Sequence, residues 1–318
     1  MTKTAKYIEE MTTARTLQVQ VFVLAHNRPQ MLRETLLSIL TQDNREFELI
    51  VSDNSTNDAV QDLIVNEFAD KLVYRRRSPP LSPIAHFQTL LEEANGEYMV
   101  LFHDDDLMRP SCVRVLRDFL DQHKNYSAAA PNAYLRTNDH LSTRIFFPGA
   151  QMVTEVGSGE EMAYRYLDLS QFRMPFPGYM YRTAMIRGIK MNPKEGGKHA
   201  DVSFLTKVAD AAPVAWLGQS LFEYRIHSGN DSWSENIPSR LSLLRFIYRT
   251  TSITRKSEVV KTYKLAYWYL WWRSNKESGK PWRRRIAFRF LLRGALLLPL
   301  RQPGLIVNVL KHRLYYLF

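Results

Sequence analysis

The sequence predicts an α/β protein with a Rossmann-like, mostly parallel central sheet and a helical extension at its C-terminal end. Short apolar runs alternate with segments of helical spacing through the first third of the chain. This alternation is typical of a parallel sheet that helices cover on both faces. At 318 residues the chain is long enough for one large domain and a smaller appendage.

The predicted elements follow one another in a strand–helix order. Strands are expected at Val19–Ala25, Phe47–Asp53, 71–77 and Tyr98–His103, and helices at 29–42, 59–68 and 84–94. The strands are continuous apolar runs rather than alternating ones, as expected where both faces of a sheet are buried. Further along, a Pro- and Gly-containing turn precedes a strand-like stretch within 174–188, and a helix of apolar period follows Asp201.

Three of these strands end in polar clusters, "AHNRP" at 25–29, "SDNST" at 52–56 and "HDDD" at 103–106. The carboxyl ends of parallel strands meet at one sheet edge, where α/β proteins bind ligands. Such residues are also common in turns and helix caps, and this alternative is strongest for "SDNST". It is weakest for "HDDD", because adjacent carboxylates repel one another and a cap needs only one. A polar crevice with a positive partner is the better interpretation.

The sequence contains neither G-x-G-x-x-G nor G-x-x-x-x-G-K-[ST], so backbone amides of a glycine-rich loop would not hold a nucleotide here. A divalent cation bound by carboxylates would neutralise a diphosphate instead. Mg²⁺ and Mn²⁺ both suit this task, because they take oxygen ligands from carboxylates and phosphates.

Three segments, "FVLAHNRPQMLRETLLSILTQ", "FELIVSDNSTND" and "ANGEYMVLFHDDDLMRP", resemble the nucleotide-sugar domain of family 2 glycosyltransferases in order and spacing. These are inverting enzymes with a GT-A fold, and the resemblance is to the type that builds bacterial cell-surface polysaccharides. It runs from about Val19 to Ser232. It implies a nucleoside-diphosphate sugar as donor, with UDP and dTDP both open, and a lipid-linked or polysaccharide acceptor. The implied donor-binding residues are Ala25, His26, Asn27, Arg28, Asp53, Ser55, His86 and Asp104.

Within that set the resemblance implies that Asp53 bonds the base and Asp104 the ribose. His26 and His86 depart from the residues that the family often has at these positions. The metal, Mn²⁺ or Mg²⁺, is expected on Asp105, with Asp106 as a close alternative. "YRIHSGNDS" at 224–232 implies a metal or diphosphate contact from His227. Arg225 is expected to support this loop, and Ser232 and Trp233 to border a lid.

Asp201 is the implied catalytic base, because family members place an acidic residue at this helix start. An inverting transfer needs one carboxylate to take the proton of the acceptor hydroxyl. From local sequence alone, a plain helix N-cap is the alternative for Asp201.

The C-terminal quarter differs in charge from the rest. Residues 245–318 hold 17 Lys and Arg against Glu258 and Glu277, and Arg285, Arg289 and Arg293 form one stripe at helical spacing. With dense aromatic residues in "YKLAYWYLWWR", this favours an anionic membrane surface as partner. A packed helical appendage with a solvated basic face is the alternative.

The expected organisation is an N-terminal extension at 1–17, a GT-A catalytic domain at 18–235 and a basic amphipathic helical region at 236–318. The single cysteine, Cys112, and the absence of an apolar N-terminal core predict a cytoplasmic protein, peripheral on the inner face of the cell membrane.

Two other functions stay open at this level. One is a non-catalytic polyanion- or nucleic-acid-binding module, although the acidic first three quarters argue against a nucleic-acid partner. The other is a sugar nucleotidyltransferase, which normally has a glycine-rich loop near its first strand.

Overall fold

The computed structural model describes residues 18–137, 140–227, 229, 236–274, 285–286 and 288–290. The strands in this part of the chain are β1 (Val19–Ala25), β2 (Phe47–Asp53), β3 (Val73–Arg76), β4 (Tyr98–His103), β5 (Leu107–Met108), β6 (Ala128–Thr137), β7 (His140–Ile145), β8 (Val153–Val156), β9 (Met180–Arg182) and β10 (Val214–Ile226). The helices are α2 (Pro29–Leu40), α3 (Ala59–Glu67), α4 (Pro83–Glu93), α5 (Cys112–Gln122), α6 (Gly159–Leu167), α7 (Thr183–Ile186), α8 (Ala200–Ala211), α9 (Ile237–Thr250) and α10 (Glu258–Ser274), with two 3₁₀ turns, η1 (Pro193–Glu195) and η2 (Gly197–His199).

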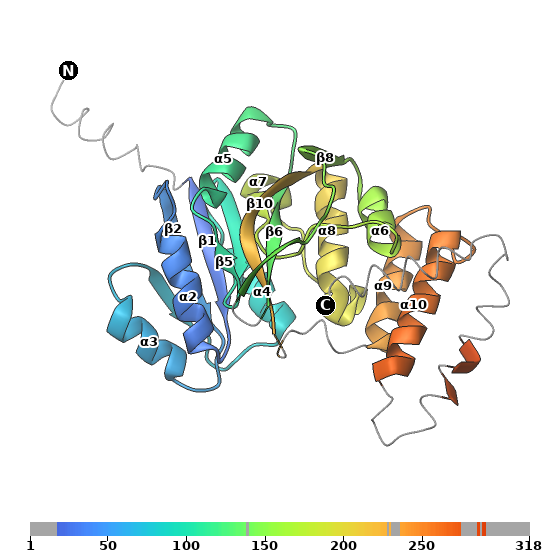
Figure 1. The fold of residues 1–318 in the computed structure, drawn as a ribbon, viewed down its shortest axis with the longest axis horizontal. Coiled ribbons are helices and arrows are strands. Elements are labelled where there is room, and N and C mark those ends of the chain that lie inside the picture. Colours follow the sequence, from blue (N-terminus) through green and yellow to red (C-terminus); the bar gives the residue numbers. More distant parts are fainter. Residues whose placement is uncertain are drawn as a thin grey trace.

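One sheet runs through the molecule in the order β3-β2-β1-β4-β9-β6-β10-β5, with β7 paired to β6 and β8 to β10 (Figure 1). The first four strands are parallel to one another. The short strand β9 lies antiparallel to β4 and β6, whereas β6 and β10 are again parallel. The mixed but mostly parallel α/β sheet confirms the predicted fold class.

The helices cover both faces of the sheet, which explains the continuous apolar strands. Along β1, Val21 and Val23 face the side covered by α2, α3 and α5, while Phe22 faces the side covered by α4 and α8. Successive side chains of a strand point to opposite faces, so a strand buried on both sides carries apolar residues without alternation. The strands Val19–Ala25, Phe47–Asp53 and Tyr98–His103 have the predicted bounds.

Helices α9 and α10 form a third apolar cluster together with α6 and Val202 of α8. In Figure 1 these helices lie at the end of the molecule opposite α2 and α3. No helix among the described residues combines the length and apolar character needed to cross a membrane. Arg293 of the predicted basic stripe, and Ser232 and Trp233 of the predicted lid, lie outside the described residues.

The direction of β10 decides which parts of the second half reach the functional edge. Since β10 is parallel to β6, and β6 and β4 are both antiparallel to β9, the strand β10 ends at the same sheet edge as β4. Only residues 212 and 213 connect α8 to β10, so α8 runs back along the sheet and begins near that edge.

Candidate active site

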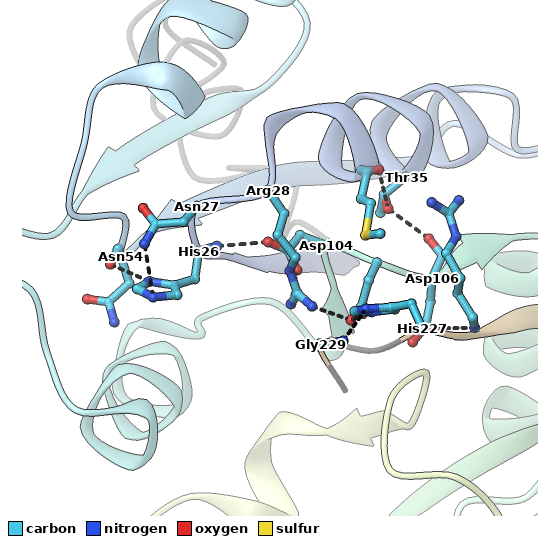
Figure 2. A network of polar contacts seen from close by, with 12 residues as sticks. His26, Asn27, Arg28, Thr35, Asn54, Asp104, Asp106, His227 and Gly229 are labelled. Carbon is cyan, nitrogen blue, oxygen red and sulfur yellow. Dashed lines mark hydrogen bonds and ion pairs between the residues drawn. The ribbon is translucent and has the colours of Figure 1, made fainter. Parts of the chain in front are cut away.

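The three predicted polar clusters lie at one edge of the sheet. In the parallel register Ala25 stands beside Asp53, and Leu24 beside His103. Neighbouring parallel strands are about 4.8 Å apart, so the residues after each strand come within hydrogen-bonding reach of one another. Figure 2 shows this network, in which the side chains of Arg28, Asp104, Asp106 and His227 converge.

The loop after β1 is tied to both neighbouring clusters. The backbone N–H of His26 donates to Asp104 Oδ2 (2.8 Å), and the backbone N–H of Asn27 donates to Ser55 Oγ (2.8 Å). Asn27 has a φ of 55°, a left-handed conformation that asparagine tolerates better than most residues. This conformation turns the chain so that Asn27 lies at the exposed rim and Arg28 reaches inward.

Arg28 binds two members of the aspartate triplet. Its guanidinium donates to Asp104 Oδ1 and, over 2.6 Å, to Asp105 Oδ2. Asp104 is fully buried, and burial raises its pKa to about 6 even though Arg28 and the N–H of His26 oppose this. Asp104 thus has both oxygens occupied within the protein and holds the loop after β1 in place.

His103, Asp105 and Asp106 form a group whose possible ligand atoms all lie within 4.8 Å of one another. Asp106 Oδ1 accepts from the backbone N–H of Arg225 (2.9 Å), while the buried Oδ2 has no hydrogen-bond partner in the described part of the chain. Burial and the neighbouring charge of Asp105 raise the pKa of Asp106 well above its usual range. Burial also acts on Asp105, but His103, Arg28 and His227 hold its pKa below the ordinary value.

His227 joins the cluster from the end of β10. Its Nε2 lies 3.0 Å from Asp105 Oδ2. Arg225, two residues earlier, is 3% exposed and donates a side-chain hydrogen bond to Glu34 in the middle of α2. The end of β10 is thereby held against both the triplet and α2.

The cluster after β2 is deeply buried. Asp53 exposes none of its surface. Its Oδ1 accepts from the N–H of Ser55 (2.8 Å), and its Oδ2 accepts from the Tyr74 hydroxyl and from Arg76, both over 2.7 Å. Asp53 therefore organises Tyr74 and Arg76 of β3, neither of which the sequence had singled out.

His86 lies on α4 beneath the same cluster and is 4% exposed. Its Nε2 is 2.8 Å from the Ser52 hydroxyl, which also accepts from Arg77 Nε. Burial and the charge of Arg77 lower the pKa of His86 to about 4. The ring is therefore neutral at physiological pH, and Ser52 can donate its hydroxyl proton to it.

Asp201 is the second residue of α8, whose N-cap is His199, so the alternative that Asp201 is the N-cap is wrong. Its Oδ1 is buried and has no hydrogen-bond partner among the residues described. Burial raises the pKa of Asp201 to about 6, against opposing effects of the Val202 backbone N–H and of Arg173 and Arg240. A carboxylate with these properties is poised to exchange a proton near neutral pH.

A continuous set of ring contacts joins the helix of Asp201 to the acidic cluster. The Phe176 ring lies 6.4 Å from His103 and 5.4 Å from Phe87 between centroids, and Phe87 lies 5.4 Å from Phe204 of α8. Together with the direction of α8, these contacts bring the first turns of α8, which carry Asp201, toward the sheet edge of the triplet.

The residues present fit a hard divalent cation. Two carboxylates and an imidazole converge, and one buried carboxylate oxygen, Asp106 Oδ2, is left without a partner in the described structure. A buried oxygen of this kind is costly unless it is satisfied, and a cation would satisfy it. His103 was not among the metal ligands expected from the sequence, and it joins the group because β4 ends at His103 and the chain turns at Asp104 and Asp105.

The profile of the family described as Glycosyl transferase family 2 matches residues 20–189, more than half of the chain. Two curated relatives match shorter stretches. The abequosyltransferase RfbV of Salmonella typhimurium is 33% identical over 101 residues, 30% of this chain and 30% of that protein. The GalNAc(5)-diNAcBac-PP-undecaprenol beta-1,3-glucosyltransferase of Campylobacter jejuni is 22% identical over 152 residues, 47% of this chain and 48% of that protein. The matches thus span about a third and about half of these relatives.

Solved structures share the fold over nearly the whole chain. S. aureus TarS 1-349 in complex with UDP has a TM-score of 0.55 at 19% identity and covers 93% of this chain and 79% of its own. The mannosyltransferase PcManGT from Pyrobaculum calidifontis, in complex with GDP-Man and Mn²⁺, has a TM-score of 0.55 at 16% identity, with coverages of 94% and 83%. At these identities the likeness concerns the fold.

Proposed function

The chain belongs to glycosyl transferase family 2, and from this premise we propose that it transfers a sugar from a nucleoside-diphosphate donor to an acceptor hydroxyl with inversion at the anomeric carbon. The observation that carries the proposal is the cluster of His103, Asp105 and Asp106 at the carboxyl edge of the sheet, with Asp201 in the first turn of α8. On one side of the anomeric carbon, the diphosphate leaving group needs positive charge. On the other side, the attacking hydroxyl needs a base.

The donor would lie across the ends of β1, β2 and β4. Asn27 and His26 are exposed at its rim, and Arg28 is partly exposed beside Asp105. Asp105, Asp106 and His103 would hold Mn²⁺ or Mg²⁺, with His227 in hydrogen-bonding contact with Asp105. When bound, the cation supplies positive charge that stabilises the departing diphosphate.

On the base side of the donor, Asp53 is the proposed contact. Its Oδ2 already accepts from Tyr74 and Arg76, whereas Oδ1 accepts one N–H and has one lone pair left. Since Asp53 is buried, a base would reach it only after the residues covering it move. Arg76, which pairs with Asp53 and has 24% of its side chain exposed, is a group that such a base could contact.

Asp201 is the proposed general base. It would take the proton of the acceptor hydroxyl as that oxygen attacks the anomeric carbon, and the nucleoside diphosphate would leave from the opposite face. The raised pKa of about 6 supports this role, because the group is ionised at pH 7 yet basic enough to accept a proton. Its Oδ1, which has no hydrogen-bond partner among the described residues, leaves a proton-accepting site.

The acceptor is proposed to be a lipid-linked or polysaccharide sugar, presented at an anionic membrane surface. The name of the Campylobacter relative specifies a sugar chain on undecaprenol-PP, and the strongly basic residues 245–318 of this chain suit an anionic surface. By this proposal the protein is peripheral on the inner face of the cell membrane, with 18–235 as the catalytic domain and 236–318 as the membrane-associated region.

A donor-hydrolysis screen tests the function directly. The protein is incubated with UDP-, dTDP-, GDP- and CDP-sugars in the presence of Mn²⁺ or Mg²⁺, and release of nucleoside diphosphate is measured. One nucleotide sugar should be consumed in a metal-dependent way, and the Asp105→Asn variant should not consume it. Absence of turnover and of binding for every donor, together with tight binding of nucleic acid, would favour the rival binding module.

A further inference from the structure

A pocket of about 390 Å³ lies away from the donor site, between η1, α9 and the loop that follows α9. Its lining residues are Lys194, Ser242, Arg245, Tyr248, Arg249 and Arg255. Four of the six are cationic and none is acidic. The volume is in the range of pockets that take small ligands.

The cations of the pocket have no paired carboxylates, unlike many arginines elsewhere in the described structure. Arg33, Arg114 and Arg165 each form an ion pair with a carboxylate. Within the described residues, Lys194, Arg245, Arg249 and Arg255 form none, and Glu195 beside Lys194 is paired with Lys207 instead. Converging like charges repel one another, so an arrangement without counter-charge is relieved by a bound anion.

A second observation comes from Tyr248 at the wall of the pocket. Its hydroxyl is buried and has no hydrogen-bond partner in the part of the chain described. Two cations flank its ring, Arg255 at 5.7 Å and Lys264 at 5.9 Å from the centroid. Burial and the charge of Arg255 lower the pKa of Lys264, which is the effect of crowded positive charge. A phosphate bound in the pocket would neutralise these cations.

The helix α9 fixes the pocket relative to the proposed base. Arg240, one of the cations that act on Asp201, lies on α9 and donates to the Tyr263 hydroxyl over 2.6 Å. Arg245 and Arg249 follow on the same helix, so the pocket begins about 8 Å further along its axis at 1.5 Å per residue. Ser242 joins the helix to η1 by donating to the carbonyl of Lys194 over 2.6 Å.

We propose that the pocket lined by Lys194, Arg245, Tyr248, Arg249 and Arg255 is an anion site that binds a phosphate or diphosphate group. This assignment rests on the sugar transfer proposed above. In that reaction the phosphate or diphosphate group belongs to the acceptor rather than to the donor. Guanidinium groups suit this task, because each offers paired N–H donors to phosphate oxygens. The site would hold the acceptor's charged group while the sugar hydroxyl reaches Asp201.

In the binding test, calorimetry measures the affinity of the protein for inorganic pyrophosphate in a buffer that contains EDTA. EDTA removes the cations that would carry pyrophosphate to the acidic cluster. The double variant R245Q/R249Q should bind pyrophosphate at least tenfold more weakly than the unaltered protein. The matched control R45Q/R187Q removes two exposed arginines outside the pocket and should bind it normally. Equal affinity of all three proteins would overturn the proposal.

Farnesyl diphosphate, farnesol and phosphatidylglycerol vesicles separate the sources of the anion. Farnesyl diphosphate should bind more weakly to R245Q/R249Q than to the unaltered protein, whereas any binding of farnesol should be the same for both proteins. If the double variant lost only vesicle binding, the pocket would be a lipid-headgroup contact and the acceptor assignment would fail.

Donor hydrolysis by R245Q/R249Q should stay unchanged, whereas the KM for a diphosphate-bearing acceptor should rise about tenfold. Pyrophosphate binding through these arginines in a protein that transfers no sugar would uphold the site and remove the proposed function instead.

Discussion

Replacing Asp201 by asparagine should make the folded protein more stable at pH 8 while stopping sugar transfer. The carboxylate of Asp201 is ionised at pH 8, yet its Oδ1 is buried and has no hydrogen-bond partner among the described residues. Asparagine has nearly the same volume and no charge. The substitution therefore removes the desolvation cost of the ion and, with it, the proposed proton acceptor.

The size of the effect follows from the shift in pKa from 3.8 to about 6. A shift of this size corresponds to about 3 kcal/mol, at about 1.4 kcal/mol for each unit. The folded state binds the proton more tightly than the unfolded state, so this contribution favours folding below pH 3.8 and is lost as the pH rises through 6. The asparagine variant lacks this loss, so its stability relative to the unaltered protein should increase between pH 4 and pH 8.

Urea denaturation at pH 4.5 and at pH 8 measures the difference, with Asp70→Asn as an exposed control. The Asp70 variant should show the same stability relative to the unaltered protein at both pH values. Transfer by Asp201→Asn should fall about 10²–10⁴-fold, as for loss of a general base, with donor affinity unchanged. In the unaltered protein the rate should rise with pH through about 6. A variant with ordinary turnover, or one no more stable at pH 8 than at pH 4.5, would refute the reasoning.

Three further predictions concern other parts of the molecule. Chelation with EDTA should abolish transfer, and Asp105→Asn should weaken nucleoside-diphosphate binding in Mn²⁺ about tenfold or more, whereas full activity in EDTA would exclude the metal. Because the pKa of His86 is lowered to about 4, the unaltered protein should lose about 3 kcal/mol of stability as the pH falls from 6.5 to 4. His86→Asn should remove this loss, and urea denaturation across the same pH range measures it. The full-length protein should sediment with phosphatidylglycerol vesicles and be released by high salt, whereas a chain ending at Ser274 should stay in solution; equal sedimentation of both would remove the membrane assignment.

Much of the first half could be predicted because its information is local. A run such as Val19–Ala25 is apolar at every position, and this pattern predicts a strand buried on both sides whatever the rest of the chain does. The order of strands and helices then places "AHNRP", "SDNST" and "HDDD" at one edge, because parallel strands end on the same side. His227 and Arg225 came from the resemblance, and the structure brings both to the triplet.

Burial and pairing are properties of the tertiary structure, and they decided what the sequence left open. The sequence could place Asp53, Asp104 and Asp106 at one edge of the sheet. It could not show that Asp53 is closed off by Tyr74 and Arg76, or that one oxygen of Asp106 has no hydrogen-bond partner within the described part of the chain. These facts depend on which side chains from distant segments occupy the neighbouring space. The same holds for the basic pocket: the sequence determines that Arg245 and Arg249 share a helix face, whereas only the packing of η1 and Arg255 against that face gathers their charges around one cavity.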